Sequence, residues 1–119
     1  MAKHRTVPAN CWDLDRVLLH PDRLFIASLL AGMEWCESAE IQNTVGMTSA
    51  GISPHLAQLR RAGYVETRRE GLSSQSRITL LGCERFANHL AALASVVSRA
   101  AEIISSRAAL ARTLDCGRL

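Results

Sequence analysis

At 119 residues, with 48% hydrophobic and 21% charged side chains, the chain has the size and composition of one globular domain rather than a disordered segment. Its formal net charge of +3 is too small to indicate a nucleic-acid partner by itself. The sequence lacks both a signal-peptide pattern and the about 18 consecutive apolar residues of a membrane span, so we expect a cytoplasmic protein that contacts no membrane.

Two helices are predicted near the start, after an N-terminal arm over residues 1–12. Proline suits the first turn of a helix and disfavours the helical conformation in the residue before it. One helix should therefore end near His20, and the next should span about residues 21–31. Gly32 should stop the second helix, and a short extended piece is expected over residues 33–36.

A helix-turn-helix unit is expected next. Ser38 is a suitable N-cap for a short helix that ends at Val45, and Gly46 supplies the left-handed position that follows many helices. A second helix should follow the turn and end near residues 62–63. Its apolar stripe has the spacing i, i+4 and i+7 and consists of Ile52, Leu56 and Leu59.

A β-hairpin is predicted after this unit. Residues 64–68 alternate between apolar and polar side chains as a strand does, and residues 77–80 can return as its partner. Because residues 71–76 between them are rich in turn-forming Gly and Ser, the hairpin should have a long polar tip.

A long helix is predicted over residues 81–112, followed by a tail over residues 113–119. At about 1.5 Å per residue the helix would extend about 48 Å, which is longer than a domain of this size can cover alone. Packing within the subunit and a membrane-surface helix are the alternatives, but the polar side carries few of the cations that a lipid surface needs. We therefore expect a homodimer whose interface is formed by Phe86, Leu90, Leu93, Val96, Val97, Ala100, Ile103 and Ile104.

Positive charge is concentrated in one region, because residues 60–85 hold six arginines against three glutamates. A short helix that braces a second one, followed by a basic two-stranded ribbon, can hold the second helix in the major groove of duplex DNA. Small side chains let the backbone approach base edges, and arginines can bind phosphates. The expected DNA contacts are Ser49, Ala50, Ser53, Pro54, His55, Gln58, Arg61, Arg68, Arg69, Ser74, Gln75 and Arg77.

Four groups of residues carry a resemblance to a known family: His20-Pro21-Asp22-Arg23-Leu24, Ile52-Ser53-Pro54-His55-Leu56, Ala62-Gly63-Tyr64-Val65, and Ile78-Thr79 with Gly82. With them, the chain resembles the MarR-like and ArsR-like winged helix-turn-helix transcriptional regulators, in particular their short single-domain members. The resemblance implies a mainly α fold with a small β-hairpin wing, a DNA-binding domain over residues 13–80 and a long C-terminal dimerisation helix. It also implies that residues 49–58 form the recognition helix and residues 68–77 the wing. A homodimer that places two such helices in successive major grooves should bind a near-palindromic operator, and we expect it to repress transcription.

Two features depart from the family pattern. Pro54 lies inside the expected recognition helix, where it removes a backbone hydrogen bond and would delay or distort the first turn. Metal sensors of the ArsR-like type carry paired cysteines near the first helix of the helix-turn-helix, but Glu37 and Ala39 stand at those places and Cys36 is alone. We therefore expect no metal site and no cofactor.

Other chemistry has little support in the sequence. The four cysteines are far apart and should be free thiols, with Cys36 a small buried hydrophobe, and His89 is expected at the surface or in the dimer interface. Because no nucleophile, phosphate-loop or metalloprotease motif occurs, we expect no enzyme. A winged helix that only binds other proteins is the alternative function. A small-molecule effector, if one acts here, would fit an apolar crevice near Trp12, Phe25, Trp35 and Phe86.

Overall fold

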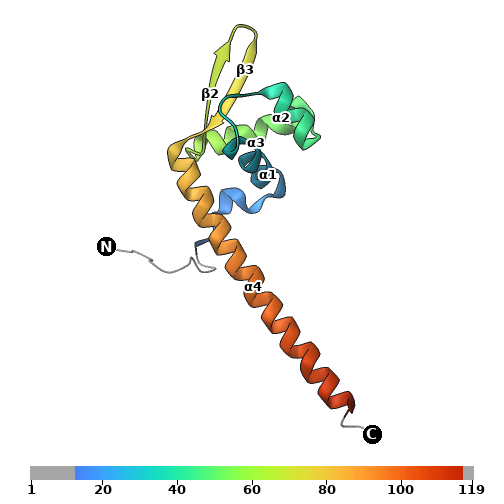
Figure 1. Ribbon diagram of the computed structural model, residues 1–119. Helices are drawn as coiled ribbons and strands as arrows, with labels where there is room; N and C mark the ends of the chain where they lie inside the picture. The colour runs from blue at the N-terminus through green and yellow to red at the C-terminus, as the bar shows by residue number, and fades with distance from the viewer. Residues whose placement is uncertain (1–12, 117–119) are drawn as a thin grey trace, which may run out of the picture.

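The computed structural model describes residues 13–116 and shows a small helical domain from which one long helix projects (Figure 1). A three-stranded antiparallel sheet completes the predicted mainly α fold with a β-hairpin wing. Among the described residues, no helix combines the length and the apolar character that a bilayer crossing needs. In chain order the elements are η2 (Arg16–Leu19), α1 (Pro21–Ala31), β1 (Cys36–Glu37), α2 (Ser38–Val45), α3 (Ser49–Arg61), β2 (Val65–Glu70), β3 (Ser73–Ile78) and α4 (Leu80–Cys116).

α1 begins at the predicted helix start. Pro21 occupies its first turn, and Nδ1 of His20 accepts a hydrogen bond from the backbone N–H of Asp22 at 3.1 Å. The predicted α-helix before His20 is wrong, because the described residues there form the 3-10 helix η2 instead. Oδ1 of Asp15 caps η2 by accepting from the N–H of Val17 at 3.2 Å, and the 4 residues of η2 are too few for a stable α-helix.

The predicted helix-turn-helix is confirmed as the pair α2 and α3. Gly46 follows α2 with a φ of +78°, in the left-handed region that favours glycine. Ser38 is not the N-cap, because Glu37 occupies that position. The hydroxyl of Ser38 instead donates to the carbonyl oxygen of Ser74 at 3.2 Å and ties the start of α2 to the hairpin.

α3 is one helix that contains Pro54. Oγ1 of Thr48 caps its start by accepting from the N–H of Gly51 at 3.1 Å, so the first turn is not delayed by the proline. The N–H that Pro54 lacks would have bonded the carbonyl of Ala50. Both residues are exposed, and water can therefore satisfy that carbonyl.

The wing is the hairpin of β2 and β3, and its turn is tight. The two strands pair over their whole lengths, which leaves only Gly71 and Leu72 in the turn. Gly71 has a φ of +63°, a conformation that two-residue hairpin turns require. The predicted long polar tip is therefore wrong, since residues 73–76 belong to β3. β1 lies on the other side of β3 and gives the strand order β1-β3-β2.

A partly buried carboxylate network joins η2, the residue before the wing and α4. The carboxylate of Asp15 accepts hydrogen bonds from the hydroxyl of Tyr64 and, at 2.8 Å, from Nη2 of Arg85. Burial by itself raises the pKa of Asp15, but these bonds and the one from Val17 outweigh it and leave the pKa below its usual value. Beside this network, the apolar core is formed mainly by Leu18, Ile26, Leu30, Ile41, Ile52, Leu59 and Tyr64.

His89 belongs to the interior, contrary to the expectation of a surface or dimer position. Its Nδ1 accepts from the backbone N–H of Asp15 at 2.9 Å, and its Nε2 has no hydrogen-bond partner among the described residues. Burial lowers the pKa of His89, although Asp15 acts in the opposite direction, so the neutral ring is favoured. The reason for the burial is its position three residues after Phe86, on the side of α4 that packs on the core.

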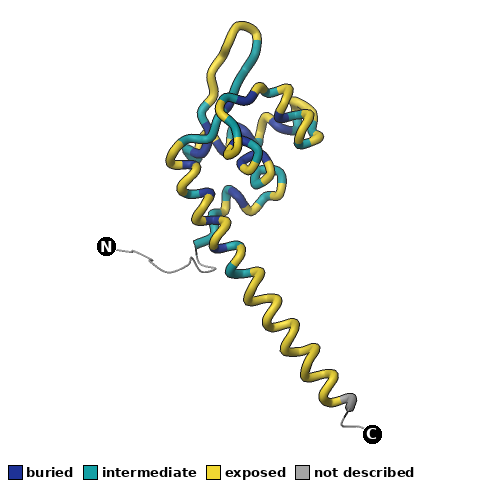
Figure 2. The backbone as a smooth tube through the Cα atoms, viewed as in Figure 1, coloured by how far each residue is buried: buried dark blue, intermediate teal, exposed yellow. Residues whose placement is uncertain are grey.

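α4 begins one residue before the predicted helix and continues into the predicted tail. Its first part packs on the domain, and Phe86 lies in the core of its own subunit rather than in the predicted dimer interface. Every residue from Val97 to Leu114 is exposed (Figure 2). This stretch, the free part of α4, therefore packs against nothing else in the described part of the single subunit.

Candidate DNA-binding surface

α3 presents an accessible face on the side opposite the core. Its apolar stripe is buried, as the spacing predicted. The exposed residues are small or uncharged apart from two arginines, and they are Ser49, Ala50, Ser53, Pro54, Gln58, Arg60 and Arg61. Such side chains allow the backbone of a helix to come close to base edges. This face therefore has the shape and polarity that the sequence predicted for a recognition helix.

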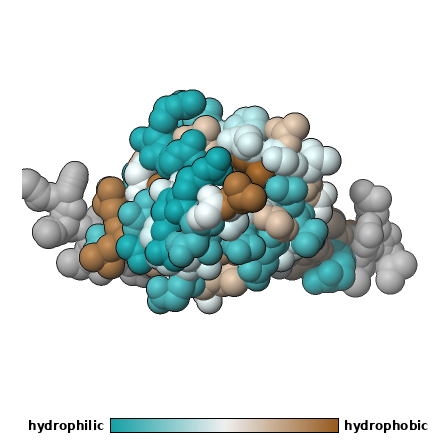
Figure 3. Space-filling view, turned by 90° about the horizontal axis from the view of Figure 1, so that it is seen from above, coloured by the Kyte–Doolittle hydropathy of each residue, from teal (hydrophilic) through white to brown (hydrophobic). Residues whose placement is uncertain are grey.

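A groove lies between α3 and the wing. Its walls are α3 on one side and β2, β3 and their turn on the other, and the start of α2 also borders it. Hydroxyl groups occur on both walls, from Ser49 and Ser53 of α3, Thr67 of β2 and Ser74 of β3. Seen from above, the described surface around the wing is largely hydrophilic (Figure 3). A groove lined in this way suits the polar sugar-phosphate backbone of DNA.

The two faces of the wing carry different arginines. Successive strand residues point to opposite faces, so Arg68 and Arg69 of β2 cannot share one. Arg69 lines the groove together with Arg60 of α3. Arg68 and Arg77 lie on the far face, where their guanidinium carbons are 4.2 and 4.5 Å from the ring centre of Trp35.

The arginines of the far face are paired locally. Nε of Arg77 forms a 2.6 Å ion pair with Glu66. Nε of Arg68 donates to Oε1 of Gln75 at 2.8 Å and lies 3.7 Å from the carboxylate of Glu70. The structure therefore separates the predicted contacts Arg68, Gln75 and Arg77 from the groove, because the pleat of the sheet turns them to its other side.

The arginines on the groove side keep their charge uncompensated. Arg60 and Arg69, which line the groove, form no ion pair within residues 13–116. Arg61 is also without an ion pair among these residues, but it does not line the groove. Nη1 of Arg60 donates to the hydroxyl of Thr67 across the groove at 3.4 Å. Arg60 was not among the predicted contacts, although its position seven residues after Ser53 places the two on one side of α3 and is a signal that could have found it.

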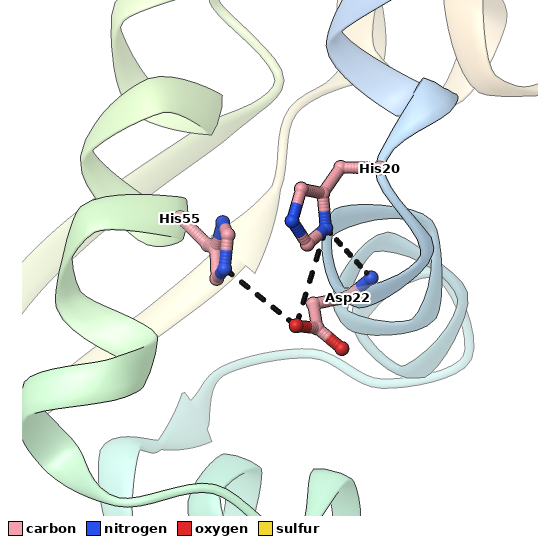
Figure 4. Close-up of side chains that lie close together, drawn as sticks. All are labelled: His20, Asp22 and His55. Atoms are coloured by element: carbon pink, nitrogen blue, oxygen red, sulfur yellow. Dashed lines mark hydrogen bonds and ion pairs between the residues drawn. The ribbon is translucent and has the colours of Figure 1, made fainter.

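His55 points toward α1 rather than into the groove (Figure 4). Its Nε2 lies 3.7 Å from the carboxylate of Asp22, and its Nδ1 lies 3.4 Å from Nη1 of Arg23. Burial lowers the pKa of His55, His20 and Arg23 lower it further, and Asp22 opposes them. The structure thus reassigns His55 from the predicted phosphate contacts to the packing of α3 on α1.

The predicted effector crevice does not form from its described aromatic residues. Phe86 is in the core, Trp35 lies against the wing arginines, and 53% of the surface of Phe25 on α1 is exposed. Trp12 lies outside the described residues. The three described aromatic residues thus lie in three different environments, because their apolar character alone does not bring them together in the fold.

Cys36 is a buried free thiol, as predicted. Burial and, to a smaller extent, the carboxylates of Glu40 and Glu37 raise the pKa of this thiol to about 11. The thiol is therefore protonated at neutral pH and unreactive. Cys83 is also free, and it is exposed.

The family of the chain follows from comparison with known proteins. Residues 23–97 match the family described as winged helix DNA-binding domain. The chain belongs to this family. The match runs from α1 to the first half of α4 and includes the helix-turn-helix, the groove and the wing. It confirms a DNA-binding, transcription-regulating protein of the predicted fold.

Three bacterial regulators are among the proteins similar to this chain. The uncharacterised HTH-type transcriptional regulator Rv0081 of Mycobacterium tuberculosis is 31% identical over 102 residues, which are 86% of this chain and 84% of that protein. Its crystal structure aligns with a TM-score of 0.58 at 32% identity, covering 78% of this chain and 87% of that one. The homodimeric winged helix-turn-helix DNA-binding domain of Mb0332 from Mycobacterium bovis aligns with a TM-score of 0.57 at 32% identity, covering 71% and 73%. The transcriptional repressor BigR of Xylella fastidiosa aligns with a TM-score of 0.55 at 27% identity, covering 60% and 71%.

Proposed function

We propose that the protein is a sequence-specific transcriptional regulator that binds a near-palindromic operator in duplex DNA as a homodimer. The observation that carries the proposal is the exposed face of α3 beside a groove in which Arg60 and Arg69 keep uncompensated charge. In the complex, α3 enters the major groove with Ala50 and Ser53 near base edges. Arg60 and Arg69 flank the helix and contact phosphates. The proposed function is therefore noncovalent binding of DNA, and it includes no catalytic step.

The second subunit covers the free part of α4. Exposed apolar side chains are unfavourable in water, and Val97, Ile103 and Ile104 expose 60%, 61% and 67% of their surfaces. The homodimeric state of the Mycobacterium bovis relative supports this arrangement. A two-fold pair would set the two α3 helices on successive turns of DNA about 34 Å apart. With Phe86 reassigned to the core, the proposed interface consists of Leu90, Leu93, Val96, Val97, Ala100, Ile103 and Ile104.

Repression is the proposed output, and the cytoplasm is the proposed location. A dimer that occupies two successive major grooves excludes other proteins from that DNA, and BigR, a relative of the same fold, is named a repressor. The alternative is a winged helix that binds proteins without reading DNA. Salt-dependent duplex binding distinguishes the two, because only the first neutralises phosphates.

Arg69→Ala and Arg60→Ala should each reduce the salt dependence of duplex binding. One phosphate contact contributes about 0.9 to the slope of log affinity against log salt concentration, so each substitution should lower the slope by about one unit per subunit. Fluorescence anisotropy titrations of a labelled duplex over a series of KCl concentrations measure this slope.

Arg77→Ala is the matched control. It removes an arginine from the same hairpin, but one that is paired with Glu66 on the far face, so the slope should stay unchanged. An equal decrease for Arg77→Ala would mean that the far face of the wing touches DNA. Unchanged slopes for Arg60→Ala and Arg69→Ala would remove the groove from the interface, and the absence of salt-dependent binding in the unmodified protein would favour the protein-binding alternative.

A further inference from the structure

Three side chains with metal-ligand chemistry meet at the contact between α1 and α3, outside the DNA-binding groove (Figure 4). His20 and Asp22 come from the start of α1, and His55 comes from α3. One nitrogen or carboxylate oxygen from each residue lies within 4.8 Å of the other two. Oδ2 of Asp22 is 3.7 Å from Nε2 of His55 and 4.0 Å from Nδ1 of His20, and the two imidazole rings are 4.5 Å apart.

We propose that His20, Asp22 and His55 bind a divalent transition metal ion such as Zn²⁺. Two imidazoles and one carboxylate ligate Zn²⁺ at about 2.0–2.2 Å, which places tetrahedral donor atoms about 3.3 Å apart. The two separations from Asp22 are only slightly longer, so small side-chain rotations close the site. The side chains of His20 and Asp22 are each 41% exposed and that of His55 is 16% exposed, which leaves an entry path and room for a water ligand.

Two neighbouring groups oppose metal binding and determine which ion is suitable. Nη1 of Arg23 brings positive charge to within 3.4 Å of Nδ1 of His55. Coordination by His20 gives up the hydrogen bond from Asp22 that caps α1. An ion with weak affinity for imidazole, such as Mg²⁺, does not offset these losses, whereas Zn²⁺, Ni²⁺ and Co²⁺ bind imidazole well.

A metal ion at this place would tie α1 to α3 and so connect metal binding to DNA binding. The ion would add a coordinate link to the packing and the polar contacts of His55 that already join the two elements. Its ligand His55 follows the exposed residue Pro54 in α3. We expect bound Zn²⁺ to change the affinity for duplex DNA by about fivefold or more. This coupling rests on the proposed function, whereas the metal site itself does not.

The test is Zn²⁺ binding to the full chain in the absence of DNA, measured by competition with a chromogenic chelator and by thermal unfolding. One ion per subunit and a raised Tm are expected. His55→Gln and Asp22→Asn should each weaken Zn²⁺ binding by about tenfold or more. His20→Asn should do the same while the metal-free Tm is retained, because Asn can still cap α1.

Cys83→Ser is the control for binding at the exposed thiol. It should leave Zn²⁺ affinity unchanged, and the spectrum of the Co²⁺ form should lack a thiolate charge-transfer band. Undiminished binding in both histidine variants, or binding lost in Cys83→Ser, would overturn the site. Zn²⁺ binding with unaltered DNA affinity would overturn the coupling alone, and failure to bind Zn²⁺ would leave the DNA-binding proposal intact.

Discussion

Val97→Glu combined with Ile104→Glu should convert the protein to a monomer and weaken binding to a full operator by more than about 100-fold. The two residues are seven positions apart and lie above one another on the apolar stripe of the free part of α4. Carboxylates there would be buried without partners in the dimer, which is strongly unfavourable. A monomer contacts only one half-site, so it loses the additional affinity that comes from binding two linked half-sites at once. Sedimentation equilibrium and anisotropy titrations measure both effects.

Ser98→Glu combined with Ser105→Glu is the matched control. Each serine is the next residue along α4, so the spacing and the added charge are the same, but the pair lies on the other side of the helix. Both serines are exposed, and dimerisation and operator affinity should be retained. Dimers that persist in the Val97 and Ile104 variant, or monomers in both variants, would contradict the proposed seam.

Gly82→Ala should lower the free energy of unfolding by about 3 kcal/mol. A Cβ atom at this position would lie 2.4 Å from the carbonyl oxygen and 2.9 Å from Cα of Tyr64. That backbone is held in place, because the same carbonyl accepts from the N–H of Thr79 at 2.9 Å. The added methyl group must therefore push the start of α4 away from the core.

Urea denaturation measures this loss, and Gly32→Ala is the control. A Cβ at Gly32 would have only the carbonyl oxygen of Leu29 nearby, at 3.8 Å, and the φ of −95° suits alanine. Its effect should stay below about 1 kcal/mol. A similarly small effect of Gly82→Ala would show that the start of α4 does not approach the backbone of Tyr64 as closely as described.

The helix-turn-helix could be predicted because its signals are local. A proline at a helix start, a glycine after α2 and an apolar stripe at i, i+4 and i+7 each act within a few residues. The faces of the wing could not be assigned in the same way. The face on which each side chain lies depends on strand register, and the two-residue turn at Gly71 and Leu72 sets that register. The Gly- and Ser-rich composition of residues 71–76 suggested a longer turn, so the register could not be derived from the sequence.

The histidines were misplaced because their partners are distant in sequence. His89 is positioned by Asp15, and His55 by residues of α1. No spacing rule connects such residues before the fold is known. For the same reason the cluster of His20, Asp22 and His55 could not be predicted, although each residue was visible in the sequence.

The central claim is that two copies of α3, related by a two-fold axis, read two half-sites of one duplex. Selection of bound fragments from random-sequence duplex DNA tests it most directly. The proposed geometry requires an enriched inverted repeat whose half-site centres are about 10 base pairs, or one helical turn, apart. Enrichment of a single unrepeated site, or no enrichment even at low salt, would contradict it.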